Sequence, residues 1–284
     1  MVRLGGPVFG GYESPEEWVR LVKKEGYRAA YCPVGVDADE NTIQAYARAA
    51  QEADILIAEV GVWRNPLSPD EKERSEAIRL CERSLYLADR IGACCCVNVA
   101  GSRGPKWDGP WAEDLTEATF EMIVEMVRKL IDTVQPVRTC FTLETMPWMY
   151  PDSPDSYLRL IRAIDRRAFA AHLDPVNLIN SPQLYFGNTA LLRECFAKLG
   201  PYIRSCHAKD ILLSDRLTVH LDEVRPGLGG LDYPTYLTEL ANLDREVPLM
   251  LEHLSSEAEY QLAAKYVKAS FPLAPGSAAL LRPG

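Results

Sequence analysis

Residues 139–211 contain three short apolar runs, TCFTLET (139–145), FAAHLDPV (169–176) and IRSCHAKDI (203–211), separated by longer helical patterns. Each run has the length of a strand and stays almost continuously apolar until polar residues end it. Strands of this kind are typical of parallel sheets, which helices cover on both faces. This part of the chain therefore predicts consecutive β–α units.

The same alternation continues in both directions from this stretch. Further strand-like runs occupy residues 28–34 (RAAYCPV), 55–62 (ILIAEVGV), 94–100 (CCCVNVA) and 248–254 (PLMLEHL), and 2–9 is a poorer candidate because of its glycines. About eight β–α units result, the number that closes an α/β (β/α)₈ TIM barrel. An open doubly wound sheet is the competing architecture, but no Gly-rich phosphate loop follows the first strand. We predict one barrel over residues 1–270 and a Pro/Gly/Ala-rich tail over 271–284.

Helix boundaries are marked by capping residues. Ser14, Ser68 and Ser153 each precede a proline and early acidic residues, which is the pattern of a helix N-terminus. Gly26 and Gly200 follow helical patterns and predict helix ends.

The composition narrows the class of protein. The chain has 284 residues, 47% of them hydrophobic, and a formal net charge of -9. An acidic chain is a poor partner for nucleic acid, whose phosphates require Lys and Arg. No apolar run approaches the roughly 18 residues of a membrane span, and none of signal-peptide length follows Arg3. We expect a cytoplasmic protein whose eight cysteines are plain, mostly buried thiols.

Polar residues end the apolar strands, where a TIM barrel builds its active site. They are Glu59, Asn98, Glu144, Asp174, His207 and Glu252. Any one of them alone is explained by a hydrogen bond or salt bridge. Buried carboxylates on several strands, however, are costly unless they are paired or bind a metal. Three carboxylates with one imidazole suit Mn²⁺, Mg²⁺, Co²⁺ or Zn²⁺ in a catalytic rather than a structural site.

Five short strings resemble those of the xylose isomerase-like TIM barrels. They are TLETMPW (142–148), HLDPVN (172–177), CHAKD (206–210), EVRPGLGGLDY (223–233) and LMLEHL (249–254). The superfamily includes ketose 3-epimerases, hydroxypyruvate isomerases, inosose dehydratases and relatives of endonuclease IV. The resemblance covers nearly the whole chain, and the ordered combination is more specific than any single string.

The resemblance implies that Glu144, Asp174, His207 and Glu252 bind one divalent ion, with Mn²⁺ as the first expectation. It also implies that Glu144 and Glu252 exchange a proton on either face of the substrate. Removing a proton next to a carbonyl gives an enediolate, which a metal stabilises through the substrate oxygens.

The chain departs from the epimerase pattern at two positions. Epimerase-like members often carry a His three residues after the metal Asp, where this chain has Asn177, and an Arg six residues after the metal His, where it has Leu213. Lys209 follows His207 at a spacing of two, so its side chain points the same way on a strand. It either acts directly on the substrate as a catalytic residue or pairs with Asp210 to orient His207.

Several side chains are expected to contact the substrate. The predicted set is Glu59, Asn98, Trp107, His172, Asn177 and Asp210. Trp107 belongs to the Gly-rich loop 101–111, which suits a lid that stacks on a sugar, or else a plain surface loop. Residues 63–65 (WRN) follow Glu59 and are candidates for contact with substrate hydroxyls or a phosphate.

Three functions remain open at this point. The first is a metal-dependent isomerase or epimerase of a small sugar or ketose. The second is an inosose dehydratase-like lyase acting on a cyclic polyol ketone. The third is a non-catalytic sugar- or metal-binding barrel subunit. A nuclease is disfavoured, because such a site needs many histidines and the chain has four. By analogy with related barrels, a homo-oligomer is a further expectation.

Overall fold

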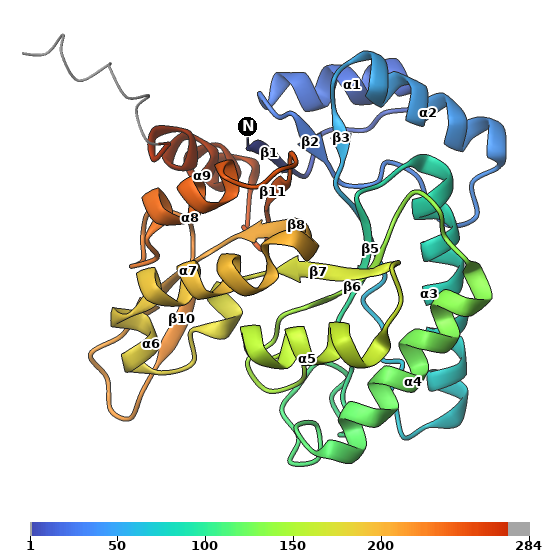
Figure 1. The fold of residues 1–284 in the computed structure, drawn as a ribbon. Coiled ribbons are helices and arrows are strands. Elements are labelled where there is room, and N and C mark those ends of the chain that lie inside the picture. The colour runs from blue at the N-terminus through green and yellow to red at the C-terminus, as the bar shows by residue number, and fades with distance from the viewer. Residues whose placement is uncertain (1, 272–284) are drawn as a thin grey trace, which may run out of the picture.

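Parallel strands form a barrel in the computed structural model, which describes residues 2–271 (Figure 1). The barrel strands are β1 (Arg3–Gly6), β2 (Ala29–Ala30), β3 (Leu56–Ile57), β4 (Glu59–Gly61), β5 (Cys95–Asn98), β6 (Phe141–Glu144), β7 (Phe169–Leu173), β8 (Ile203–Ala208) and β11 (Pro248–Leu251). Their order is β3-β2-β1-β11-β8-β7-β6-β5-β4. Ala58 alone separates β3 from β4, so the two ends of the sheet belong to one interrupted strand and the ring closes. The TIM-barrel prediction is confirmed.

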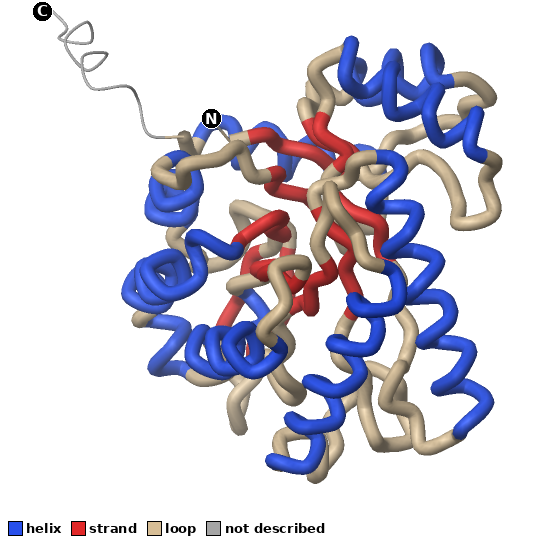
Figure 2. Tube along the Cα trace, turned by 45° about the vertical axis from the view of Figure 1, so that its right-hand side comes forward, coloured by secondary structure: helices blue, strands red, loops and turns tan. Residues whose placement is uncertain are grey.

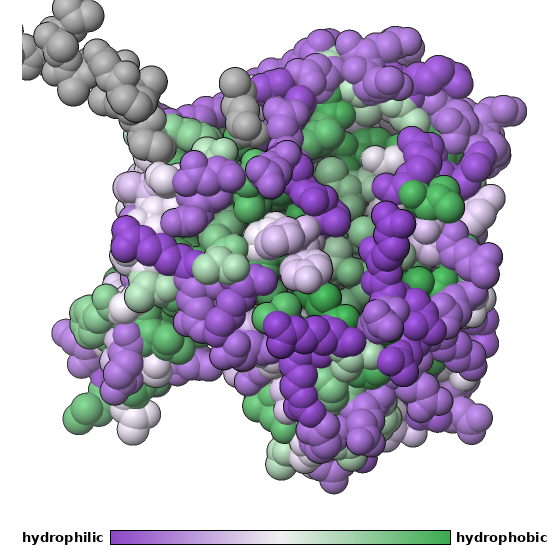
Figure 3. All heavy atoms as spheres, in the orientation of Figure 1, coloured by the Kyte–Doolittle hydropathy of each residue, from purple (hydrophilic) through white to green (hydrophobic). Residues whose placement is uncertain are grey.

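Helices follow one another around the outside of this ring (Figures 1 and 2). They are α1 (Pro15–Lys24), α2 (Glu40–Glu52), α3 (Glu71–Ile91), α4 (Glu117–Val134), α5 (Pro154–Ile164), α6 (Pro182–Phe186), α7 (Asn188–Leu199), α8 (Tyr233–Ala241) and α9 (Glu257–Ala269). Short 3₁₀ turns lie at Val176–Leu178 and Gly200–Tyr202. The helices bury their apolar sides against the strands, while hydrophilic side chains cover most of the face in Figure 3.

Two of the three predicted helix starts are confirmed. Ser14 and Ser153 cap α1 and α5, each accepting a hydrogen bond from the backbone N–H three residues on. The third prediction is wrong by two residues, because Asp70 rather than Ser68 caps α3. Ser68 instead accepts a hydrogen bond from the backbone N–H of Asp70. Gly200 does end α7, but with φ of -44° it leads directly into a 3₁₀ turn.

The glycines that weakened the first strand candidate prove to be part of the barrel. Residues 3–6 form β1, between β2 and β11. A Cβ on Gly5 would lie 2.5 Å from the carbonyl oxygen of Ala29, so the close approach of β2 requires glycine there. The missing side chain lowers the strand signal in the sequence and at the same time permits the packing.

The run predicted at residues 203–211 is two elements rather than one. β8 ends at Ala208, and β9 (Asp210–Leu213) pairs antiparallel with β10 (Leu221–Val224) in a hairpin outside the barrel sheet. The chain therefore leaves the barrel between His207 and Asp210. This exit separates the environments of Lys209 and Asp210, whose pairing was one of the two alternatives that the sequence left open.

All eight cysteines are free. Cys81, Cys95, Cys96, Cys195 and Cys206 are fully buried, and Cys32, Cys94 and Cys140 are half-buried. None of the helices in the described part of the chain is both long enough and apolar enough to cross a bilayer. The predicted tail, 271–284, lies outside the described residues except for Phe271.

Candidate active site

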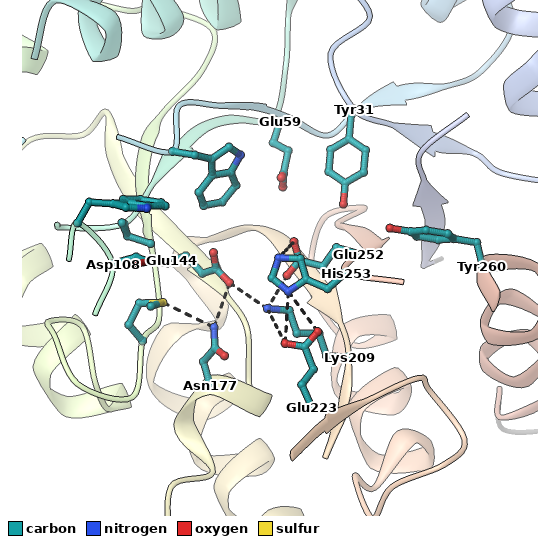
Figure 4. Close-up of a pocket in the computed structure, with 14 residues that line it drawn as sticks. Tyr31, Glu59, Asp108, Glu144, Asn177, Lys209, Glu223, Glu252, His253 and Tyr260 are labelled. Atoms are coloured by element: carbon teal, nitrogen blue, oxygen red, sulfur yellow. Dashed lines mark hydrogen bonds and ion pairs between the residues drawn. The ribbon is translucent and has the colours of Figure 1, made fainter. Parts of the chain in front are cut away.

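The carboxyl ends of the strands surround a cavity of about 460 Å³ (Figure 4). One part of its lining is charged or polar: Glu59, Asp108, Glu144, Asn177, Lys209, Glu223, Glu252 and His253. The remainder is aromatic or apolar: Tyr31, Trp63, Val99, Trp107, Met146 and Tyr260. A few convergent polar groups beside apolar walls are typical of a small-molecule site.

Four neighbouring strands bring the predicted metal ligands together. Glu144 is the last residue of β6, Asp174 directly follows β7, His207 lies in β8 and Glu252 directly follows β11. These strands are adjacent in the order β6-β7-β8-β11, so their carboxyl ends meet at one place. Tyr236 donates a hydrogen bond of 2.9 Å to the carbonyl oxygen of His207 and fixes that strand end from the helix side.

The donor atoms of these four residues lie within 4.8 Å of one another. Nδ1 of His207 is 2.7 Å from Oε1 of Glu252, 3.2 Å from Oε1 of Glu144 and 3.8 Å from Oδ2 of Asp174. Oδ2 of Asp174 and Oε1 of Glu252 are buried and face the cationic groups of Lys209 and His207. Three carboxylate oxygens and one imidazole nitrogen this close together fit a hard divalent cation.

Lys209 faces the same cluster. Its Nζ lies 2.6 Å from Oε1 of Glu252, 2.8 Å from Oδ2 of Asp174, 3.6 Å from Oε1 of Glu144 and 3.7 Å from Oε2 of Glu223. The side chain is 2% exposed yet reaches the cavity wall. It is therefore placed to meet both the metal ligands and a bound molecule.

Asp210 points elsewhere and does not line the cavity. Its Oδ1 accepts hydrogen bonds from the backbone N–H groups of Ile211 and Leu231, and its Oδ2 accepts from those of Gly227 and Gly229. Four donors occupy both oxygens of a fully buried carboxylate. Asp210 thus holds the Gly-rich loop after β10, and the pairing of Lys209 with Asp210 is not formed.

The charged groups of the cluster shift one another's pKa values. Burial raises the pKa of the Glu144 carboxyl, more than Lys209 and His207 lower it. For Asp174 and Glu252 burial acts in the same direction, but Lys209 and His207 outweigh it and lower both pKa values, that of Glu252 to about 2. The carboxylates in turn hold the pKa values of His207 and Lys209 well above their ordinary range, against the effect of burial.

A second buried carboxylate, that of Glu59, lies on the Nε2 side of His207. Oε1 of Glu59 is 3.4 Å from Nε2 of His207, and Oε2 of Glu59 accepts a hydrogen bond of 2.9 Å from Ser205. Nδ1 of His172 is 3.5 Å from the same Oε2. The two nitrogens of His207 thus face different acids, Nδ1 the metal ligands and Nε2 Glu59. A carboxylate on the far nitrogen is the arrangement that orients a metal-bound imidazole.

His172 is fully buried, and neither ring nitrogen has a hydrogen-bond partner within the described residues. Burial and the nearby His207 lower its pKa to about 4, so the ring is neutral at pH 7. Its centroid lies 4.2 Å from that of His207 in an edge-on contact. His172 therefore packs under His207, a predicted metal ligand, and does not line the cavity.

The predicted substrate-binding residues divide into two groups. Glu59, Trp107 and Asn177 line the cavity, and Nδ2 of Asn177 donates a hydrogen bond of 3.1 Å to Glu144. Asn98, His172 and Asp210 do not line it. Asn98 is fully buried and forms hydrogen bonds with the backbone of residue 64.

Sequence reasoning missed several residues of the lining. Glu223 and His253 pair at 3.1 Å at the cavity mouth, and Tyr31 and Tyr260 stand on one side of it in Figure 4. Tyr31 lies in the predicted strand 28–34, so its position near a strand end was a usable signal. Glu223 and Tyr260 gave no comparable signal, because a hairpin and a helix carry them to the cavity.

Residues 19–270 match the family model described as xylose isomerase-like TIM barrel. The chain belongs to this family. The resemblance stated from the sequence strings is therefore confirmed. A search of curated proteins gives no match.

Solved structures of the same fold cover nearly the whole chain. A xylose isomerase-like TIM barrel protein of Mycobacterium smegmatis, in complex with magnesium, shares 17% identity at a TM-score of 0.67 and covers 95% of each chain. D-psicose 3-epimerase of Clostridium cellulolyticum H10, with D-tagatose, shares 14% identity at a TM-score of 0.67, covering 96% of this chain and 100% of the other. The probable 3-DHS dehydratase of Bacillus anthracis shares 18% identity at a TM-score of 0.67, covering 91% and 94%. At such identities these likenesses establish the fold and not the activity.

Proposed function

We propose that the chain is a divalent-metal-dependent isomerase or epimerase of a small sugar or ketose. One observation carries the proposal: three carboxylates and an imidazole lie within 4.8 Å of one another at the edge of a cavity of about 460 Å³. Glu144, Asp174, His207 and Glu252 would hold the ion, with Mn²⁺ the first choice and Mg²⁺, Co²⁺ and Zn²⁺ as alternatives. Structural neighbours that are sugar epimerases, one of them with D-tagatose, support this class of substrate.

The bound ion supplies a Lewis acid that stabilises negative charge on the substrate oxygens. Glu144 and Glu252 remove and return the proton next to the carbonyl, one from each face of the substrate. Their carboxylates lie on two sides of the Lys209 ammonium in Figure 4, 3.6 and 2.6 Å from it. That ammonium would stabilise the charge of the enediolate.

A dehydratase-like lyase is the second candidate. It rests on Lys209, whose buried ammonium reaches the cavity and would protonate a departing hydroxyl. Loss of a β-hydroxyl after removal of the α-proton needs an acid or a metal ion to assist the leaving hydroxyl. A probable dehydratase among the structural neighbours supports this alternative.

Glu59, Trp107 and Asn177 are the proposed substrate contacts that line the cavity. The lining contains Lys209 as its one Lys or Arg among the described residues, and Lys209 is already paired with carboxylates. An unphosphorylated substrate is therefore proposed. Cytoplasmic location and a homo-oligomeric state stay predictions.

Elemental analysis of the purified protein beside its Asp174→Ala/His207→Ala variant tests the proposal. We expect about one equivalent of a divalent metal in the parent and none in the variant. The metal-loaded parent is then incubated with ketoses and inososes in D₂O, and NMR follows deuterium uptake at the carbon next to the carbonyl. A parent that neither holds nor takes up metal would reject the proposed function.

A further inference from the structure

Trp63 adopts a backbone conformation that L side chains rarely adopt. It follows β4, and its φ is 54°, in the left-handed region. A non-glycine residue there is strained and persists only where the surrounding structure enforces it. Such residues gather at functional sites, so the cause of the strain and the direction of the side chain need an explanation.

Asn98 enforces this conformation through two hydrogen bonds to the residue that follows Trp63. Its Oδ1 accepts a hydrogen bond of 3.0 Å from the backbone N–H of Arg64, and its Nδ2 donates one of 3.0 Å to the carbonyl oxygen of the same residue. Asn98 ends β5 and is fully buried, so it cannot move to follow the loop. On the other side of Trp63, the backbone N–H of Val62 bonds the carbonyl oxygen of Val97 at 2.9 Å. Both neighbours of Trp63 are thereby tied to β5.

Gly61 makes room for the indole. A Cβ at position 61 would lie 2.3 Å from Nε1 of Trp63, well inside van der Waals contact. The backbone of Gly61 itself is not in the left-handed region. The glycine therefore serves the placement of the Trp63 ring rather than a turn.

The fixed indole stands beside the proposed metal site. Its centroid is 6.5 Å from that of the His207 imidazole, with 38° between the planes. It lines the catalytic cavity and also an adjacent cavity of about 310 Å³, so it forms the wall between them. The Trp63 side chain is half-buried, so part of a large aromatic ring remains exposed to the cavity even though the backbone is strained at this residue.

We propose that Trp63 is the stacking surface for a substrate bound as a ring, and that the site therefore selects a cyclic polyhydroxy ketone over an open-chain ketose. The inference rests on the metal and proton-transfer chemistry of the proposed function and, of the two candidate substrate classes, takes the cyclic polyol ketone. A ring polyol presents its C–H groups on one flat face, which packs on a rigid indole and leaves the hydroxyls and carbonyl free toward Glu144, Lys209 and Glu252. An open chain presents no such face and loses more rotational freedom on binding.

Two ketones and four variants, one of them a control, test the inference on the Mn²⁺-loaded protein. The cyclic probe is scyllo-inosose, and the open-chain probe is L-erythrulose, whose four carbons do not close into a stable ring. Calorimetry measures the Kd of each probe for the parent, Trp63→Leu, Trp63→Phe and Gly61→Ala. Trp111→Leu is the matched control, because this tryptophan is 45% exposed and does not line the cavity. Mn²⁺ affinity and thermal unfolding are recorded for every variant to verify that the metal site and fold persist.

We expect the parent to bind the inosose more tightly than erythrulose. Trp63→Leu should weaken inosose binding by about tenfold and leave erythrulose within about twofold, while Trp63→Phe, which keeps an aromatic face, should recover part of the loss. Gly61→Ala should reproduce the effect of Trp63→Leu with the indole still present but displaced.

Equal losses for both probes, or no loss for either, would overturn the inference and leave the proposed function intact. The same holds if the parent binds erythrulose and exchanges its proton but ignores the inosose. If the parent binds Mn²⁺ but neither binds nor exchanges either ketone, the inference falls together with the ketone chemistry of the proposed function.

Discussion

The two ends of the barrel differ in how their charged side chains are paired. At the amino ends of the strands, Arg3 pairs with Glu246 at 2.5 Å and with Asp54 at 2.7 Å, and Arg28 pairs with Asp54 as well. Two cations and two anions balance there. These paired charges tie the starts of β1, β2, β3 and β11 together.

At the carboxyl ends of the strands, the acidic and basic side chains do not balance. Lys209 and His207 face a larger number of acids, namely Glu59, Glu144, Asp174, Glu223 and Glu252. Even with His207 protonated, negative charge is in excess inside a largely buried cluster, which is costly unless a further cation is bound. The comparison teaches that paired charges connect the strands at one end, whereas the excess of acids at the other end suits the proposed cation.

Glu144→Gln should produce the largest effect, a loss of proton exchange at the carboxyl-end site. Proton exchange on a reactive ketone should fall by about 10²–10⁴-fold, because the amide cannot accept the proton. The fold should persist, since the amide matches the carboxylate in size. Deuterium uptake followed by NMR measures the loss, and circular dichroism verifies the fold. Arg3→Met is the control at the other end and should retain full exchange; an unchanged rate in Glu144→Gln would remove this residue from the chemistry.

Mn²⁺ should stabilise the folded protein by binding the proposed ligands at the carboxyl ends of the strands. At a free concentration of 100 times Kd the gain is about 2.7 kcal/mol, visible as a rise in Tm by calorimetry. Asp174→Ala should show no rise, because it loses a ligand. Arg3→Met starts from a lower Tm and should rise by as much as the parent does. A rise that persists in Asp174→Ala would place the ion elsewhere.

Glu59→Ala should weaken Mn²⁺ binding without removing a ligand. Glu59 faces Nε2 of His207, and loss of such a partner typically costs about 10–100-fold in metal affinity. Glu59→Gln should lose less, because its amide oxygen still accepts a hydrogen bond from Nε2. Competition with a chelator gives the Kd values. If both variants match the parent, Glu59 does not orient the imidazole.

Arg3→Met should give the smallest effect, confined to stability. The partners of Arg3 are 61% and 40% exposed, so solvent screens the pairs and the loss is about 1 kcal/mol in urea unfolding at pH 7. Hydrogen bonds from Arg3 hold the pKa values of the Asp54 and Glu246 carboxyls below their ordinary range. Their stabilisation is therefore present above about pH 4 and is lost as the pH falls further. Unfolding of the metal-free proteins at pH 7 and pH 3 should show the difference between parent and variant shrinking in acid. A difference that stays constant would mean that these pairs contribute nothing.

Local sequence signals predicted most of the barrel and erred where contacts between distant segments decide. The start of α3 is a local exception: the Asp70 carboxylate accepts a hydrogen bond from the backbone N–H of Glu73, although Ser68-Pro69 has the same pattern as the two true starts. β1 looked weak because of glycines that only the approach of β2 explains. Asp210 looked like a site residue because it follows His207 closely, but a loop some 20 residues later takes both its oxygens.

The sequence by itself determined the barrel and the residue types of the proposed metal site. Apolar strands alternate with capped helices, and six of the strand-like runs contain a polar residue near their end whose type is readable without knowing its neighbours. The spacing of two also predicted that Lys209 points the same way as His207, but tertiary structure alone decided that Asp210 turns away from the acids and that Trp63 lies against the cavity. The physical reason is that each direction is set by packing and hydrogen bonds between strands far apart in the chain, such as the bonds from Asn98 that fix the backbone beside Trp63.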